Sequence, residues 1–254
     1  MLPGRPAWIR LCDVLGFREN VRKIARAIAS ASLLGSVIAS VATSAALCRD
    51  GHGAPDRHRY PLRGIDVSHY QGSIDWRAVA RDDVAFAYVK ATEGVDGRDA
   101  RFARNWREAH RAGIRVGAYH YFIFCRSGRA QAHNFLDVAP HRKSSLPPAV
   151  DLELGHSCRG QLTGPRMRRE LDAFLAVVEA REHRHAVLYV TPQFFATYRA
   201  YLPKRPMWRR SILLKPAPEA SWTFWQYHSR GRVAGIRTLV DLNVSSAGGH
   251  VLAL

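Results

Sequence analysis

Short apolar segments alternate with amphipathic segments along the chain from residue 64 onward. Eight of these apolar segments, six to ten residues long and rich in β-branched and aromatic side chains, are typical of strands. They cover residues 64–70, 85–92, 115–124, 147–154, 186–191, 208–214, 223–228 and 238–244. In the stretches between the first five, apolar residues recur with the period of a helix. This periodicity predicts helices at 75–83, 102–113, 128–139 and 164–183.

The order of these elements predicts the class of fold. Strands that alternate with helices favour parallel β/α units, and eight strands are enough to close a barrel. Little helix is expected after residue 191, so we predict an α/β fold, an irregular eight-stranded β/α barrel (TIM-like) with few helices in the last third. The main alternative is a doubly wound open sheet. The first strand is not followed by the Gly-x-Gly-x-x-Gly loop that would favour a nucleotide-binding sheet of that kind.

Acidic residues recur near equivalent ends of the expected strands. Asp66 lies in the first strand and Glu93 just after the second, Asp151 and Glu153 lie in the fourth, and Asp241 lies in the last. Catalytic residues of β/α barrels gather at the carboxyl ends of the strands, around one mouth. Positions i and i+2 of a strand face the same side, so Asp151 and Glu153 should project together. Each acid alone could cap a strand or pair with an arginine, but their repetition predicts one shared acidic site.

The first 62 residues differ from the rest in composition. A basic stretch ends at Arg26, and residues 27–47 carry no charge and many small side chains. This order is typical of a secretory signal, although 21 residues could also form a transmembrane anchor, and Cys48 weakly resembles a lipidation site. We therefore expect a signal peptide or membrane anchor at 1–48, a polar linker at 49–62 and a barrel domain at 63–254. The protein would be exported, to the periplasm or the cell exterior, with residues 27–47 as a possible anchor.

The chain is strongly basic, with 38 Lys and Arg against 21 Asp and Glu and a formal net charge of +17. About +11 of this charge lies beyond residue 63, so the folded part is basic as well. Such a balance suits polyanions in general, including nucleic acid, an anionic membrane surface or a carboxylate-bearing cell wall. A converging set of acids would repel nucleic acid phosphates, so we expect no nucleic acid partner.

Several motifs together resemble one known family, the family 25 glycoside hydrolases, which are lysozymes of the N-acetylmuramidase type. The matching segments are GIDVSHYQGSIDW (64–76), YVKATEG (88–94), AGIRVGAYHYF (112–122), PPAVDLE (147–153), WQY (225–227) and VAGIRTLVDLN (233–243). They occur in family order across about residues 62–246. The resemblance implies hydrolysis of the β-1,4 bond between N-acetylmuramic acid and N-acetylglucosamine in peptidoglycan glycan strands.

The resemblance also implies roles for individual residues. Glu153 would be the general acid, and Asp151, Asp66 and Asp241 the other acidic catalytic positions. The carboxylates around Glu153 would keep it protonated near neutral pH, as a general acid requires. The route favoured is assistance by the substrate's own acetamido group with net retention, although sequence alone leaves retention and inversion open. The residues expected to bind the saccharide are Tyr119, His120, Glu93, Tyr70, Gln226 and, as an aromatic sugar platform, Trp225.

The cysteines predict one structural bridge and no metal site. Cys125 follows the third expected strand and Cys158 follows the fourth, so their loops should be neighbours and could form a disulfide after export. The His156-Ser157-Cys158 segment lacks the repeated spacing of zinc ligands. We therefore expect a monomeric hydrolase without metal or cofactor. The alternative is a non-catalytic barrel that only binds a cell-wall polysaccharide.

Overall fold

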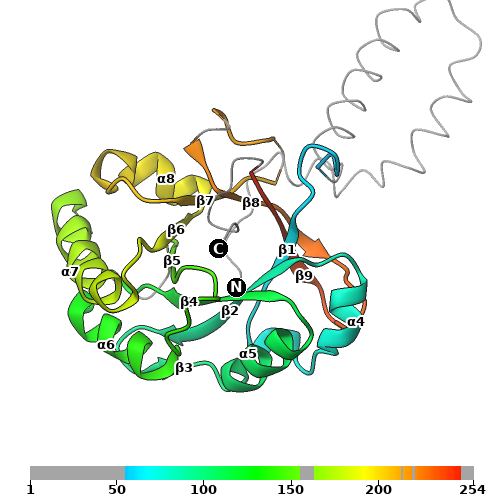
Figure 1. Ribbon diagram of the computed structural model, residues 1–254. Helices are drawn as coiled ribbons and strands as arrows, with labels where there is room; N and C mark the ends of the chain where they lie inside the picture. Colours follow the sequence, from blue (N-terminus) through cyan, green and yellow to red (C-terminus); the bar gives the residue numbers. More distant parts are fainter. Residues whose placement is uncertain (1–54, 155–162, 213, 219–220, 247–254) are drawn as a thin grey trace, which may run out of the picture. The chain divides into compact units, whose positions relative to one another are not determined.

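A sheet that closes on itself forms the framework of the computed structural model, which describes residues 55–154, 163–212, 214–218 and 221–246 (Figure 1). The strand order is β1-β9-β8-β7-β6-β5-β4-β2-β3, and β1 also pairs with β2, so eight strands form a ring and β3 extends from β2. The strands are β1 (Arg63–Val67), β2 (Phe86–Glu93), β3 (Gly97–Arg98), β4 (Arg115–Tyr121), β5 (Ala149–Leu152), β6 (Val187–Val190), β7 (Met207–Arg210), β8 (Phe224–Gly231) and β9 (Val240–Ser245). This arrangement confirms the predicted barrel.

Helices cover the outside of the barrel along its first two thirds (Figure 1). They are α4 (Trp76–Arg81), α5 (Phe102–Arg111), α6 (Gly128–Val138), α7 (Gly164–Glu182) and α8 (Pro192–Tyr198), with short 3-10 turns η1 (His69–Gln71) and η2 (Arg199–Tyr201). The sequence pattern did not predict α8. Its signals are Thr191, whose side chain accepts a hydrogen bond from Phe194 N, and Pro192 in the first turn.

Three expected strands end three or more residues earlier than the apolar pattern suggested. The first ends at Val67 because Ser68 caps the turn η1, and its backbone N–H donates to Gln71 Oε1 over 2.9 Å. The expected strands at 115–124 and 208–214 end at Tyr121 and Arg210. Local capping thus places His69 and Tyr70 in a turn at the barrel rim rather than in a strand.

The last strand runs opposite to its neighbours. All pairings from β1 through β8 around the ring are parallel, whereas β9 is antiparallel to both β8 and β1. A tight connection of eight residues joins β8 to β9, which is too short for a crossover helix. As a consequence, the first residues of β9 lie at the same end of the barrel as the last residues of β1.

Aromatic rings fill the interior of the barrel. Phe86 packs against Phe224 with ring centroids 5.1 Å apart, and Tyr88 packs against Trp208 at 4.8 Å. Tyr189 meets the other side of Trp208 at 4.9 Å, edge to face. Because successive strand residues alternate between faces, a second and larger apolar cluster lies between the barrel wall and the helices. The interior is therefore packed rather than hollow below the mouth.

The segment before the barrel is described only in part. Of the expected linker, residues 55–62 are described, and Tyr60 packs on Trp222 and Trp225 against the outside of the barrel. The predicted signal or anchor at 1–48, and its apolar stretch 27–47, lie outside the described residues. Within the part of the chain that the structure describes, no helix is long and apolar enough to cross a membrane.

We expect Gly117→Ala to destabilise the barrel. A Cβ at Gly117 would overlap the buried Tyr88 ring and lie 3.0 Å from Leu146 Cβ, so the interior rings would have to shift. Overpacking of this kind lowers the free energy of unfolding by about 1–3 kcal/mol. Urea denaturation of the variant measures the change. Arg115→Ala on the same strand, where the side chain is exposed, is the control, and equal midpoints for all three proteins would contradict the predicted clash.

Candidate active site

A pocket of about 180 Å³ opens at the carboxyl ends of the parallel strands. It contains all four acidic residues that the sequence analysis assigned to catalysis. Its lining includes Asp66, Tyr70, Gln71, Lys90, Tyr119, Tyr121, Asp151, Glu153, Tyr189, Trp208 and Asp241. Four of the five acids expected at one mouth thus meet in this pocket, and the fifth, Glu93, lies in a neighbouring pocket.

Asp66 and Asp241 face each other across the β1–β9 pair, where they are directly opposed in register. Asn243 Nδ2 donates to Asp66 Oδ2 over 2.8 Å, and Asn243 Oδ1 accepts from Trp208 Nε1 at 2.8 Å, so the amide is fixed from both ends. Burial raises the pKa of Asp66 well above its ordinary value, and the charge of Asp241 adds to this. The hydrogen bond between the two carboxyls raises the pKa of Asp66 and lowers that of Asp241. Asp66 is therefore the harder of the two carboxyls to ionise.

Asp241 retains a more moderate acidity than Asp66. Burial raises its pKa to about 6, Arg210 opposes the rise and Glu153 contributes to it. Hydrogen bonds from Asp66 and Gln226 stabilise its charged form. Asp241 is accordingly the more acidic member of the pair.

Asp151 has an unpartnered oxygen in the pocket. Its Oδ1 atom is buried, and no described group donates a hydrogen bond to it. Burial raises the pKa of Asp151 well above its ordinary value, followed by the charges of Glu153 and Asp66, while Lys90 opposes the rise. A buried acceptor without a donor is unfavourable unless a bound molecule supplies one. This atom therefore marks a place where a ligand N–H or O–H would be held.

Glu153 lies one strand position beyond Leu152, on the same face as Asp151. Burial raises its pKa, against the lowering effects of Arg210 and of the Tyr189 hydroxyl. The sequence analysis attributed this rise to the neighbouring carboxylates. In the structure, the main cause of the raised pKa of Glu153 is burial. The charge of a neighbouring carboxylate matters more at Asp151, where Glu153 is the largest cause of the raised pKa after burial.

Tyrosines and one lysine complete the pocket wall. Burial raises the pKa of Tyr119 and Tyr189 well above the ordinary value, so both hydroxyls stay protonated. Lys90 Nζ lies 5.0 Å from the centre of the Tyr121 ring. The sequence analysis did not select Lys90, Tyr189 or Trp208. Lys90 had a signal, since it follows Tyr88 by two residues in an apolar strand and must share its inward face.

The structure places His120 outside the groove. Tyr119 and Tyr121 of β4 face the pocket, so His120 between them must face the helices. Its Nδ1 lies 2.7 Å from Thr92 Oγ1, its Nε2 lies 3.1 Å from Gln131 Oε1, and its ring is fully buried. Burial lowers its pKa to about 3, so the ring is neutral. The expectation that His120 lines the groove is corrected to a structural role under α6.

Trp225 and Gln226 were both expected to line the groove, but they are neighbours in β8 and point to opposite faces of the barrel wall, and neither lines the pocket. Trp225 lies on the outer face among Tyr60 and Trp222, and its Nε1 donates to Ser211 O over 2.7 Å. It is therefore no sugar platform in this structure. Gln226 points inward and is buried beneath the pocket, where its Oε1 accepts from the Tyr189 hydroxyl at 2.6 Å. Gln226 supports Asp241 rather than lining the pocket.

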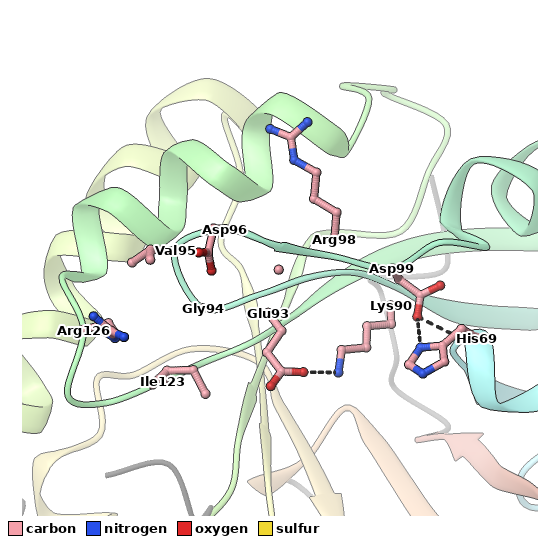
Figure 2. Close-up of a pocket in the computed structure, with 11 residues that line it drawn as sticks. His69, Lys90, Glu93, Gly94, Val95, Asp96, Arg98, Asp99, Ile123 and Arg126 are labelled. Atoms are coloured by element: carbon pink, nitrogen blue, oxygen red, sulfur yellow. Dashed lines mark hydrogen bonds and ion pairs between the residues drawn. The ribbon is translucent and has the colours of Figure 1, made fainter.

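Glu93 and Tyr70 lie at the rim. Tyr70 is 74% exposed on η1 and lines the catalytic pocket. Glu93 lines a neighbouring pocket, where its Oε2 pairs with Lys90 Nζ at 2.7 Å, and Asp99 Oδ2 lies 2.8 Å from His69 Nδ1 (Figure 2). Lys90 lines both pockets, so the ion pair between Glu93 and Lys90 lies at the boundary between them.

The structure describes only one of the two cysteines of the predicted disulfide. Cys125 lies in the loop after β4, as expected. Cys158 lies outside the described residues. The pairing of the two cysteines stays a prediction.

Comparisons with known proteins agree with this geometry. The model of the Glycosyl hydrolases family 25 matches residues 65–236. Lysozyme M1 of Streptomyces globisporus is 38% identical over 209 residues, which is 76% of this chain and 71% of that protein. A family 25 glycosyl hydrolase from Bacillus anthracis superposes with a TM-score of 0.71 at 36% identity, covering 76% of this chain and 92% of that structure. The bacterial lysozyme from Streptomyces coelicolor superposes with a TM-score of 0.68 at 36% identity, covering 76% and 96%.

The family match spans more than half of the chain, and it includes Asp66, Asp151 and Glu153. Asp241 lies five residues beyond its end, on the strand that pairs with Asp66. The chain belongs to the glycosyl hydrolases of family 25.

Proposed function

We propose that this protein is a muramidase that hydrolyses the β-1,4 bond between N-acetylmuramic acid and N-acetylglucosamine in peptidoglycan. The observation that carries the proposal is the pair Asp151 and Glu153, two carboxyls with raised pKa on one face of β5 inside one pocket. Glycosidic bonds are cleaved by such carboxyl pairs. The names of the two lysozymes to which the chain is similar support the choice of substrate.

Glu153 acts as the general acid. Burial raises its pKa, so its carboxyl stays protonated further toward neutral pH than an exposed glutamate. It gives this proton to the glycosidic oxygen while the bond from that oxygen to C1 breaks. Asp151 is unsuited to this step, because the charges of Glu153, Asp66 and Asp241 add to burial in raising its pKa and hold its proton more tightly.

Asp151 orients the acetamido group of the sugar. Its unpartnered Oδ1 accepts the acetamido N–H, which satisfies the buried acceptor. The acetamido carbonyl oxygen then attacks C1 as the leaving oxygen departs. In the second step water attacks C1, Glu153 takes the proton of the water, and the acetamido oxygen is released, which gives net retention.

Asp241 and Asp66 supply charge where the sugar ring becomes positive. Asp241 is the ionised partner, and Asp66 holds the proton that links the two carboxyls. A negative charge in a pocket from which water is partly excluded stabilises an oxocarbenium-like centre more than a charge in water would. Tyr119 provides a ring surface on which the sugar can rest.

We also propose that the protein acts outside the cytoplasm. The support is the order of regions in residues 1–48, a basic stretch followed by an uncharged apolar stretch. Peptidoglycan lies in the same compartment. Export also creates the oxidising conditions under which Cys125 and Cys158 could pair.

Replacement of the general acid tests the proposed function. We expect Glu153→Gln to lower kcat on purified peptidoglycan by roughly 10²- to 10⁴-fold, because an amide cannot supply the proton. Released fragments are reduced and identified by mass spectrometry, and the wild type should yield chains that end in reducing N-acetylmuramic acid.

Asp172→Asn on α7 is the matched control, since it removes a carboxyl whose side chain is 48% exposed and paired with Arg168. It should retain full activity. If neither the wild type nor Glu153→Gln releases fragments while both sediment with the wall, the protein is a polysaccharide-binding barrel and the proposal is overturned.

Neutralisation of Asp151 should stabilise the fold. The pKa of Asp151 is raised in the folded state, so its contribution to stability is full below the unfolded pKa, about 4, and is lost as pH rises through the folded pKa. At pH 7 we expect Asp151→Asn to raise the free energy of unfolding by roughly 1–2 kcal/mol. Near pH 3.5 the two proteins should be equally stable.

Thermal unfolding across this pH range measures the effect. Asp137→Asn, at a side chain 66% exposed, serves as the control and should follow the wild-type pH dependence. A variant at Asp151 that is no more stable than the wild type at pH 7 would show that burial of this carboxyl carries no penalty.

A further inference from the structure

A second groove lies beside the catalytic pocket, on the outside of the barrel between α4, α5 and the segment before β9. Its volume is about 1050 Å³, and residues 71–77, 235–238 and one side of α5 line it. Figure 1 shows α4 and α5 next to each other below β1 and β9. Gly235 O accepts a hydrogen bond from Asp75 N at 3.0 Å, which fastens one wall of the groove to the start of α4.

Four arginines line this groove: Arg77, Arg104, Arg111 and Arg237. All four are exposed. Arg104 Nε pairs with Glu108 Oε1 at 2.9 Å. No hydrogen bond or ion pair from a described residue engages the guanidinium of any of the other three.

The two acids in the groove do not neutralise these arginines. Glu108 is paired with Arg104, and Asp75 caps α4 by accepting from the backbone N–H groups of Arg77 and Ala78 at 3.1 Å each. In the pocket of Figure 2, by contrast, Lys90 is paired with Glu93. The groove therefore presents a net positive lining with unused guanidinium donors.

The groove and the catalytic pocket share one wall. Gln71 lines both of them. Its side chain is held in place, because its Oε1 accepts from Ser68 N at 2.9 Å and its Nε2 donates to Leu239 O at 3.2 Å. A molecule that occupies the catalytic pocket and branches past Gln71 would enter the arginine groove.

We propose that this groove binds the carboxylates of the peptide stems on the glycan strand that occupies the catalytic pocket. The inference rests on the proposed function and adds a specificity site to it. Guanidinium groups match carboxylates with paired hydrogen bonds, and the stems carry free carboxylates on alternate sugars. The shared wall at Gln71 favours a branch of the same substrate over a separate phosphodiester polymer, which would have no reason to lie beside the pocket.

Binding to the full chain with Glu153→Gln tests the groove, because this protein does not cleave its ligand under the proposed mechanism. Calorimetry compares soluble glycan oligomers that carry peptide stems with the same oligomers after amidase removal of the stems. We expect the stem-bearing oligomers to bind roughly 5- to 30-fold more tightly, as three exposed charge contacts allow. Arg77→Gln, Arg111→Gln and Arg237→Gln together should abolish this preference, and added salt should weaken it.

The matched control removes three arginines from α7, which lies on the far side of the barrel from α4 in Figure 1. Arg166→Gln, Arg169→Gln and Arg181→Gln together lower the net charge equally, and each of these side chains is exposed. This variant should keep the preference. An equal loss in both triple variants would assign the effect to net charge and overturn the proposal, as would equal affinity of the parent for both oligomers.

A third arm uses a soluble glycerol phosphate polymer as competitor. If it binds through the same three arginines more tightly than the stem-bearing oligomers, the ligand is a phosphodiester polymer and the assignment to stems is overturned. Hydrolysis by the wild type is measured separately. Absence of hydrolysis together with a stem preference would overturn the proposed function while the groove retained its ligand.

Discussion

A dry layer of aromatic rings across the barrel is the constraint on which the catalytic pocket depends. Tyr88, Phe224 and Trp208 fill the interior, and Trp208 also lines the pocket from below. Because these rings exclude water from beneath, burial is the largest cause of the raised pKa at each of the four carboxyls. The small residues Gly64 and Gly117 leave room for the rings of Phe86 and Tyr88. The packing of the interior thus also sets the acid–base chemistry of the pocket.

The antiparallel direction of β9 brings Asp241 to the acidic pocket. A parallel β9 would carry Asp241 at the opposite end, because this residue is the second of the strand. In the antiparallel direction Asp241 lies opposite Asp66, and Asn243 reaches both Asp66 and Trp208. One amide therefore links the aromatic layer to the carboxyl pair. The reversal also leaves the outside of β8 without a helix, where Trp225 and its aromatic neighbours cover the wall instead.

The sequence predicted the eight strands of the ring and, except for Glu93, the meeting of the acids, because both follow from local periodicity and from the geometry of parallel strands. It was mistaken about His120 and Trp225 for one physical reason. Tyr119 and His120, like Trp225 and Gln226, are adjacent in a strand, so only one of each pair can face the pocket. A sequence motif contains both neighbours and does not show which of the two faces the pocket. The arginine groove had no signal at all, since three distant segments build it.

An anionic substrate can approach both the acidic pocket and the basic surface because the pKa values of the pocket carboxyls are raised. Four ionised acids in one pocket would repel a strand that carries carboxylates of its own, as they would any polyanion. Burial keeps protons on Asp66, Asp151 and Glu153 to higher pH than on exposed carboxyls, so the pocket carries less negative charge than its composition suggests. The field of a chain with a formal charge of +17 can then dominate the approach of an anionic strand. The burial that prepares Glu153 to donate a proton also removes the electrostatic barrier to its substrate.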